Sequence, residues 1–132
     1  MSKIVITNVE EARWVRETQT EDGRKRGVQV VGEVEEGMRA FIMNVAPDYE
    51  TEVHSHSQDE VIVVVEGELR MGKRVLGPNS IILIPKDIQY RLGAGPDGAR
   101  FINVRPGPAD YQPVDGPVVT SEQLYSQGAT IP

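Results

Sequence analysis

Cysteine is missing from the 132-residue sequence, and only two histidines are present. Without thiols the chain has no disulfide bonds, thiolate zinc sites or cysteine nucleophiles. Basic residues are also scarce, because 14 Lys and Arg side chains stand against 20 Asp and Glu side chains, for a net charge of −6. A nucleic-acid partner requires clustered Lys and Arg, so this balance argues against nucleic-acid binding.

Long apolar runs are lacking as well. No stretch approaches the roughly 18 residues that suggest a membrane span, and the N-terminus lacks the apolar core of a secretory signal. We therefore expect a protein with no membrane partner and a cytoplasmic location. The length suits one domain with a substantial apolar core.

Glycine and proline, by contrast, are frequent, with 13 and 9 residues that divide the sequence at short intervals. Between them lie strand-length segments that are rich in Val and Ile and bounded by Gly, Pro, Asn or Asp. The clearest segments are residues 28–31, 40–45, 61–65, 81–84 and 100–104. Many short strands with frequent turn signals predict an all-β sandwich or barrel rather than βαβ units.

Two capping-box patterns predict short helices that flank the strands. Asn8 with Glu11 forms the first pattern, and Thr120 with Gln123 forms the second. Within a single domain we expect three segments: an N-terminal arm with a short helix and a loop, a barrel core, and a C-terminal tail with a short helix. Their bounds are residues 1–27, 28–106 and 107–132.

The two histidines, His54 and His56, lie two residues apart. Side chains alternate along an extended segment, so both imidazoles face one side. Glu60, four residues further on, reaches the same space if the chain bends through residues 57–59. Two imidazoles and one carboxylate form a facial triad, which binds Fe(II), Mn(II) or a similar ion and leaves coordination positions open.

The spacing around these residues is that of a known motif. The run His54-x-His56-x3-Glu60-x6-Gly67 fits the pattern G-x5-H-x-H-x3,4-E-x6-G, and on this motif the chain resembles the cupin family. Residues 77–90 resemble the second cupin motif, G-x5-P-x-G-x2-H-x3-N, and retain its proline. The resemblance covers most of the domain.

The resemblance implies a cupin-type jelly-roll β-barrel and a homodimer. It also implies one divalent metal ion as cofactor, with Fe, Mn, Ni, Zn and Cu as the alternatives. His54, His56 and Glu60 would be its ligands, and Tyr90 occupies the position of the second-motif histidine, the usual fourth ligand. Because the chain has no third histidine, a three-imidazole site within one subunit is excluded.

Tyr90 has three interpretations at this position. It is a phenolate ligand of the metal, because a nearby dication favours ionisation of a group whose free pKa is about 10. It is a phenol that acts as a general acid or donates a hydrogen bond to bound substrate. Or it is a packing residue in a cupin whose site has decayed.

Three glycine positions of the two motifs hold other residues, namely Asp48, Asn79 and Asp87. Asp and Asn are the non-glycine residues that best tolerate a left-handed backbone. The substitutions therefore keep the backbone conformation that glycine allows, and the fold assignment survives them.

Six further residues are candidate substrate-binding residues, because strand alternation turns them toward the same interior. They are Arg39, Phe41, Met43, Phe101, Asn103 and Arg105. An inward arginine holds a substrate carboxylate in a bidentate manner, although the surface is the commoner place for arginine. For the apolar residues, core packing is the alternative to ligand contact.

The function that follows is a metal-dependent enzyme acting on a small organic molecule, with Glu60 and Tyr90 as catalytic residues. The ion either activates O2 beside the substrate, as in a dioxygenase, which is an oxidoreductase, or stabilises an enolate as a Lewis acid, as in an isomerase, lyase or cyclase. The alternative is a non-catalytic cupin that binds a small ligand and has a degenerate metal site. The missing second-motif histidine favours this alternative.

Overall fold

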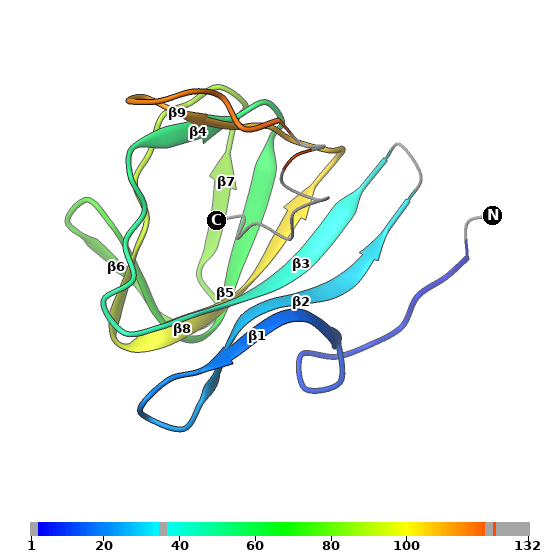
Figure 1. The fold of residues 1–132 in the computed structure, drawn as a ribbon, viewed down its shortest axis with the longest axis vertical. Coiled ribbons are helices and arrows are strands. Elements are labelled where there is room, and N and C mark those ends of the chain that lie inside the picture. Colours follow the sequence, from blue (N-terminus) through cyan, green and yellow to red (C-terminus); the bar gives the residue numbers. More distant parts are fainter. Residues whose placement is uncertain (1–2, 35–36, 121–122, 124–132) are drawn as a thin grey trace.

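The computed structural model describes residues 3–34, 37–120 and 123, and most of these residues form antiparallel strands (Figure 1). The strands are β1 (Arg13–Gln19), β2 (Lys25–Glu33), β3 (Arg39–Val45), β4 (His54–His56), β5 (Glu60–Met71), β6 (Arg74–Leu76), β7 (Ile81–Ile84), β8 (Gly93–Arg105) and β9 (Tyr111–Pro113). Each of the five segments predicted as strands lies in one of them, in β2, β3, β5, β7 or β8. In the described residues no helix has the length and apolar character needed to cross a bilayer.

The strands form two sheets around one interior (Figure 1). The larger sheet has the order β1-β2-β3-β8-β5-β6, and β7 also pairs with β5. The smaller sheet consists of β4 and β9. Figure 1 shows that the larger sheet curves and that the β4–β9 pair lies across one end of the interior. The predicted all-β barrel is confirmed.

The register between β3, β5 and β8 decides which side chains face the interior. Ile62 of β5 lies opposite Asn103 of β8, which in turn lies opposite Phe41 of β3. Residues two apart on a strand share a face. Glu60 and Arg105 therefore face the same side as Ile62 and Asn103, and both are buried.

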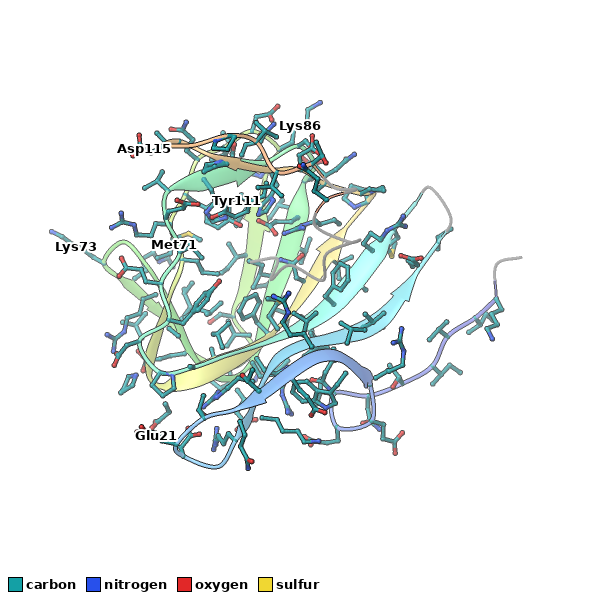
Figure 2. The ribbon with its side chains drawn as sticks, viewed as in Figure 1. Glu21, Met71, Lys73, Lys86, Tyr111 and Asp115 are labelled. Atoms are coloured by element: carbon teal, nitrogen blue, oxygen red, sulfur yellow. The ribbon has the colours of Figure 1, made fainter. Side chains whose placement is uncertain are left out.

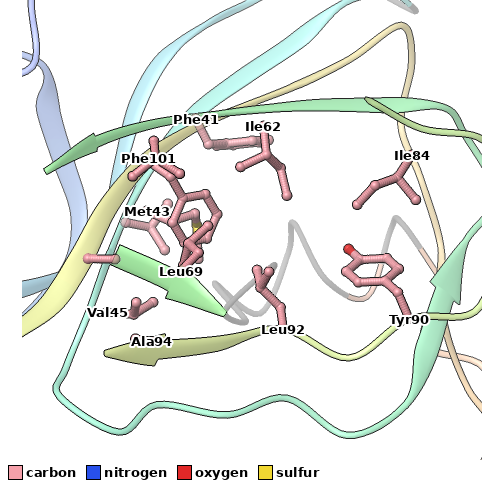
Figure 3. Packing of buried hydrophobic residues seen from close by; sticks show 13 residues of the cluster. Phe41, Met43, Val45, Ile62, Leu69, Ile84, Tyr90, Leu92, Ala94 and Phe101 are labelled. Carbon is pink, nitrogen blue, oxygen red and sulfur yellow. The ribbon is translucent and has the colours of Figure 1, made fainter. Parts of the chain in front are cut away.

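Apolar side chains fill one part of the interior (Figure 3). Ile62, Leu69, Leu92 and Phe101 are fully buried. Burying a side chain of this size stabilises the fold by about 1.5 to 3 kcal/mol. Tyr90 lies at one end of this cluster (Figure 3), and its hydroxyl donates to the Glu60 carboxylate.

The three residues at cupin glycine positions have the backbone conformation that glycine favours. Their φ angles are 61° at Asp48, 74° at Asn79 and 64° at Asp87, and no other non-glycine residue in the described ranges has positive φ. The sequence prediction is confirmed. Glycine itself is retained at Gly67, where φ is 73° and a Cβ atom would lie 2.2 Å from the carbonyl oxygen of Gly98.

The predicted N-terminal helix is wrong. Asn8 does cap a turn, because its Oδ1 accepts hydrogen bonds from the backbone N–H groups of Glu10 and Glu11 at 2.9 and 3.0 Å. The chain then enters β1, where Trp14 pairs with Gln29 of β2. A single turn is enough to satisfy the Asn8 cap. The residues that follow form more hydrogen bonds in a strand paired with β2 than they would in a short isolated helix.

At the other end the predicted capping box forms. The N–H of Thr120 donates to Oε1 of Gln123 at 2.9 Å, and the N–H of Gln123 donates to Oγ1 of Thr120 at 3.2 Å. The rest of the predicted helix lies outside the described residues. The predicted division into an arm, a core and a tail stays a prediction, although both flanking segments contribute a strand: β1 pairs with β2, and β9 pairs with β4.

Candidate functional site

The two histidines lie on β4, at the end of the barrel that β9 covers (Figure 1). The N–H of His54 donates to the carbonyl of Tyr90 at 3.0 Å, and the N–H of Tyr90 donates to the carbonyl of His54 at 2.8 Å. The ring centroids of His54 and His56 are 5.0 Å apart, and both residues are buried. The two imidazoles and the Tyr90 ring therefore occupy one space.

Backbone carbonyls fix the tautomer of both imidazoles. Nδ1 of His54 lies 2.8 Å from the carbonyl oxygen of Glu52, and Nδ1 of His56 lies 3.0 Å from that of Asp110. A carbonyl oxygen only accepts, so each Nδ1 carries the proton. Burial lowers the pKa of both rings, to about 4 for His56. Both rings are thus neutral, with unprotonated Nε2 atoms.

Glu60, the first residue of β5, is the hydrogen-bond acceptor at the centre of the site. Its carboxylate accepts from Nδ2 of Asn103 at 2.8 Å, from Nη2 of Arg105 at 3.2 Å and from the hydroxyl of Tyr90. Burial, the largest effect, and the Glu60 carboxylate both raise the pKa of Tyr90, so its phenol stays protonated. Glu60 and Arg105 form an ion pair that solvent does not reach.

Arg105 also contacts a histidine. Its Nη2 lies 3.3 Å from Nε2 of His56 and 3.2 Å from Oε2 of Glu60. A guanidinium has donors only, so it donates to the neutral His56 ring and links β4 to β5. Five side chains are joined in this way, and the ring of His54 lies against those of His56 and Tyr90. We call these six side chains the polar cluster: His54, His56, Glu60, Tyr90, Asn103 and Arg105.

Besides its hydrogen bond to the Glu52 carbonyl, His54 is held by aromatic rings. Its ring stacks on Tyr111 with centroids 4.5 Å apart and an interplanar angle of 17°, and the Tyr90 ring is also 4.5 Å away. Figure 2 shows Tyr111 beside the β4–β9 pair, at this end of the interior. Nε2 of His54 is buried and has no hydrogen-bond partner among the described residues.

The remaining predicted contacts lie elsewhere. Arg39 faces the β2–β3 turn, where its Nη1 donates to the carbonyls of Val34 and Gly37 at 2.7 and 3.0 Å. The three apolar candidates all belong to the apolar core: Phe41, Met43 and Phe101. Their contact with a substrate stays a prediction, and core packing describes what they do in this structure.

Sequence reasoning missed Tyr111. The residue follows a proline-rich segment that carries no strand pattern, yet it begins β9 and pairs with His56 of β4. Its hydroxyl donates to Oε1 of Glu52 at 3.2 Å. The only signal in the sequence was an aromatic residue in a polar tail, which does not indicate the strand with which it pairs.

The predicted metal ligands divide into two groups. His54 and His56 suit a divalent ion, because neutral imidazoles whose Nδ1–H groups are held by carbonyls present Nε2 as metal ligands do. Glu60 does not, because three other side chains already donate to its carboxylate. Within residues 3–34, 37–120 and 123 no three His, Cys, Asp or Glu side chains are grouped so that they could hold a metal ion.

The charge of Arg105 explains this misfit. Unit charges 4 Å apart interact by about 4 kcal/mol at an effective dielectric constant of about 20, and a dication doubles this value. A divalent ion bound to both His56 and Glu60 would lie beside the guanidinium that now bridges them. The residues therefore do not fit a three-ligand metal site in this arrangement. The metal site stays a prediction.

Neither a scan against protein-family models nor a search of the curated proteins found a match. Solved structures match in fold. The polyketide cyclase RemF from Streptomyces resistomycificus has a TM-score of 0.62 at 23% identity, covering 96% of this chain and 94% of that one. An RmlC-like cupin from Ralstonia eutropha has a TM-score of 0.62 at 13% identity, covering 91% and 81%. KdgF from Halomonas sp. has a TM-score of 0.56 at 20% identity, covering 80% and 94%.

These likenesses identify the architecture. The described strands form a cupin-type jelly-roll β-barrel, and the chain has the fold of a small cupin domain. Within that fold the polar cluster lies at one end of the barrel, under the β4–β9 pair. At these identities the likeness concerns the fold alone.

Proposed function

We propose that this protein is an enzyme that moves a proton next to a carbonyl group of a small organic molecule held in the barrel, as isomerases, lyases and cyclases do. The observation that carries the proposal is Nε2 of His54, a buried and unprotonated nitrogen without a hydrogen-bond partner among the described residues. A neutral imidazole nitrogen of this kind accepts a proton from a substrate.

The rest of the polar cluster supports the same chemistry. When a proton leaves the carbon beside a carbonyl group, negative charge develops on the carbonyl oxygen, and fixed positive charge or donors stabilise it. Arg105 supplies a fixed positive charge in this space, and Tyr90 holds a phenol proton against Glu60. The polyketide cyclase activity of RemF is a precedent for cyclisation on this fold.

A metal-dependent enzyme is the second candidate, and the state of the two imidazoles favours it. His54 and His56 are neutral and present Nε2 to the interior. A bound Fe, Mn, Ni, Zn or Cu ion would supply Lewis-acid chemistry or, for a redox metal, O2 activation as in a dioxygenase. Glu60 would then bind the ion in place of its ion pair with Arg105.

A binding domain without catalysis is the third candidate. It is supported by Tyr90, because the phenol donates to Glu60 instead of projecting toward a ligand. The small organic partner is common to all three candidates and stays a proposal.

The homodimer also stays a proposal. Two exposed apolar side chains on β7, Ile81 and Leu83, offer surface that a second copy would cover.

Hydrogen–deuterium exchange tests the first candidate without knowledge of the natural substrate. A panel of β-diketones, β-keto esters and 2-oxo acids is incubated in D2O with the protein, and loss of the α-proton signal is followed by NMR. We expect exchange to be accelerated for at least one compound and to fall by about a hundredfold or more in His54→Gln, the usual worth of a general base.

Arg70→Gln is the matched control, because Arg70 is a half-exposed arginine of β5 that forms an ion pair with Glu68. It should exchange at the rate of the unmodified protein. If no compound of the panel exchanges faster with the protein than without it, proton transfer is refuted. If a panel compound nevertheless raises the melting temperature, the binding domain is supported.

A further inference from the structure

We propose that Arg105 takes the place of a metal ion in this barrel, so that the polar cluster works with a built-in cation. The role of this cation in catalysis rests on the proposed function. The ligand is then an organic molecule with hydrogen-bond donors, and metal chelation takes no part in holding it.

The contacts of Arg105 carry the first step. Its Nε and Nη2 both reach Oε2 of Glu60, at 3.4 and 3.2 Å, and Nη2 also reaches Nε2 of His56 at 3.3 Å. The Glu60 carboxylate and the His56 imidazole are two of the three ligand groups that a facial triad would use. One guanidinium therefore joins the carboxylate to an imidazole, as a divalent ion would.

The charge balance carries the second step. The guanidinium of Arg105 is a cation, and its charge neutralises that of Glu60 inside the barrel. A divalent ion at this place would break the hydrogen bonds of Arg105 to Glu60 and His56 and lie beside a buried guanidinium. Arg105 thus opposes metal binding by occupying the ligands and by repulsion.

The strand register fixes this arrangement. Arg105 is the last residue of β8 and pairs with Arg39 of β3, and its side chain is fully buried. Its partner Glu60 begins β5, which is paired with β8 along most of its length. Exchange of the arginine for a neutral residue of similar length should leave this pairing intact and release Glu60 and His56.

Two unpaired acceptors indicate what the site binds. Nε2 of His54 and Oδ1 of Asn103 are buried and lack hydrogen-bond partners within the described ranges. Buried acceptors are almost always paired, with protein, water or ligand. A ligand that carries hydroxyl or N–H groups satisfies both, and an enolisable polyhydroxy or polyphenolic carbonyl compound combines these donors with the proposed chemistry.

Cobalt titration tests the role of Arg105, with Co2+ alone as the probe. The protein is prepared without a histidine tag, and calorimetry and the visible spectrum follow binding to the unmodified chain, Arg105→Gln, and Arg105→Gln with His54→Gln. We expect Arg105→Gln to bind one equivalent of Co2+ at least about a hundredfold more tightly than the unmodified chain does, because the variant lacks the positive charge that repels the ion. The double variant should lose this gain.

The matched control is Arg70→Gln, which removes an arginine of β5 that forms a half-exposed ion pair with Glu68 and should leave Co2+ binding as weak as in the unmodified chain. Equally tight, stoichiometric Co2+ binding by the unmodified chain overturns the proposal, and this measurement stands even if Arg105→Gln fails to fold.

Chelation separates this proposal from the proposed function. Exchange of substrate protons that persists after EDTA treatment supports both. Exchange that is lost on EDTA treatment and restored by a divalent ion overturns the built-in cation and leaves proton transfer standing. Weak Co2+ binding without any exchange refutes proton transfer and leaves the role of Arg105 standing.

Discussion

The two ends of the barrel interior share strands β5 and β8 and differ in what they bury. At one end β3, β5 and β8 contribute Met43, Leu69 and Phe101 to an apolar cluster. At the other end β5 and β8 contribute Glu60 and Arg105 to the polar cluster. All five side chains are almost completely buried.

The two ends contribute unequally to the stability of the fold. Apolar burial is favourable in itself, by roughly 25 cal/mol for each Å² removed from water. A buried ion pair gains little, because desolvation offsets the attraction between its charges. We infer that the apolar end carries the stability, while the polar cluster is retained for what it does.

The largest expected effect comes from the apolar end. Phe101→Ala should lower the free energy of unfolding by about 4 kcal/mol, because it removes a fully buried ring and leaves a cavity. Urea unfolding monitored by circular dichroism measures the change. Val75→Ala, on the exposed side of β6, should stay within about 0.5 kcal/mol of the unmodified protein. Equal losses in the two variants would contradict the comparison.

Breaking the ion pair should have the next largest effect. Arg105→Met leaves Glu60 as a buried charge without its cation, which should cost at least about 3 kcal/mol. Combining it with Glu60→Gln removes both charges, and this double variant should recover most of the loss. Urea unfolding of the two single variants and the double variant gives the coupling. Additive losses would show that the two residues do not act as a pair.

The pH dependence of stability should expose the buried imidazoles. Burial and Arg105 lower the pKa of His56 from 6.5 to about 4, so between these values the unfolded chain binds more protons than the folded one. Stability should therefore fall as the pH is lowered through this window, by up to about 3 kcal/mol from His56. Unfolding of the protein and of His56→Gln between pH 7 and 4 should differ in slope, with the flatter curve for the variant. Parallel curves would mean that folding leaves the pKa of His56 unchanged.

The smallest expected effect lies outside both ends, in the turn that contains Asn79. Its φ of 74° is strained for most residues. Asn79→Ala should lose about 1 kcal/mol, whereas Asn79→Gly should remain within about 0.5 kcal/mol. Thermal unfolding compares the two. An Ala variant as stable as the Gly variant would show that the turn relaxes at no cost.

Local patterns in the sequence predicted much of this molecule. The strand segments follow from β-branched runs between turn residues, and the positive φ angles at Asp48, Asn79 and Asp87 follow from the glycine positions of two motifs. The grouping of His54 with His56 follows from alternation on a strand. Each of these rests on residues that are near one another in the chain.

The parts that depend on distant pairing could not be predicted. Placing Arg105 against Glu60 requires the register of β5 on β8, which no local pattern contains. The same holds for Tyr111, whose position depends on the pairing of β9 with β4. The prediction of an N-terminal helix was wrong for a related reason. The residues after Asn8 pair with β2, and the capping pattern of Asn8 does not reveal this pairing.

The tautomers of His54 and His56 decide whether both rings present unprotonated Nε2 atoms to a site whose cation is Arg105. A long-range 1H–15N correlation spectrum of labelled protein at pH 7 resolves both nitrogens of each ring, before and after one equivalent of Zn2+. We expect two neutral rings protonated on Nδ1, with Nε2 signals that Zn2+ leaves unchanged. Rings that are positively charged or protonated on Nε2, or Nε2 signals that move with Zn2+, would contradict it.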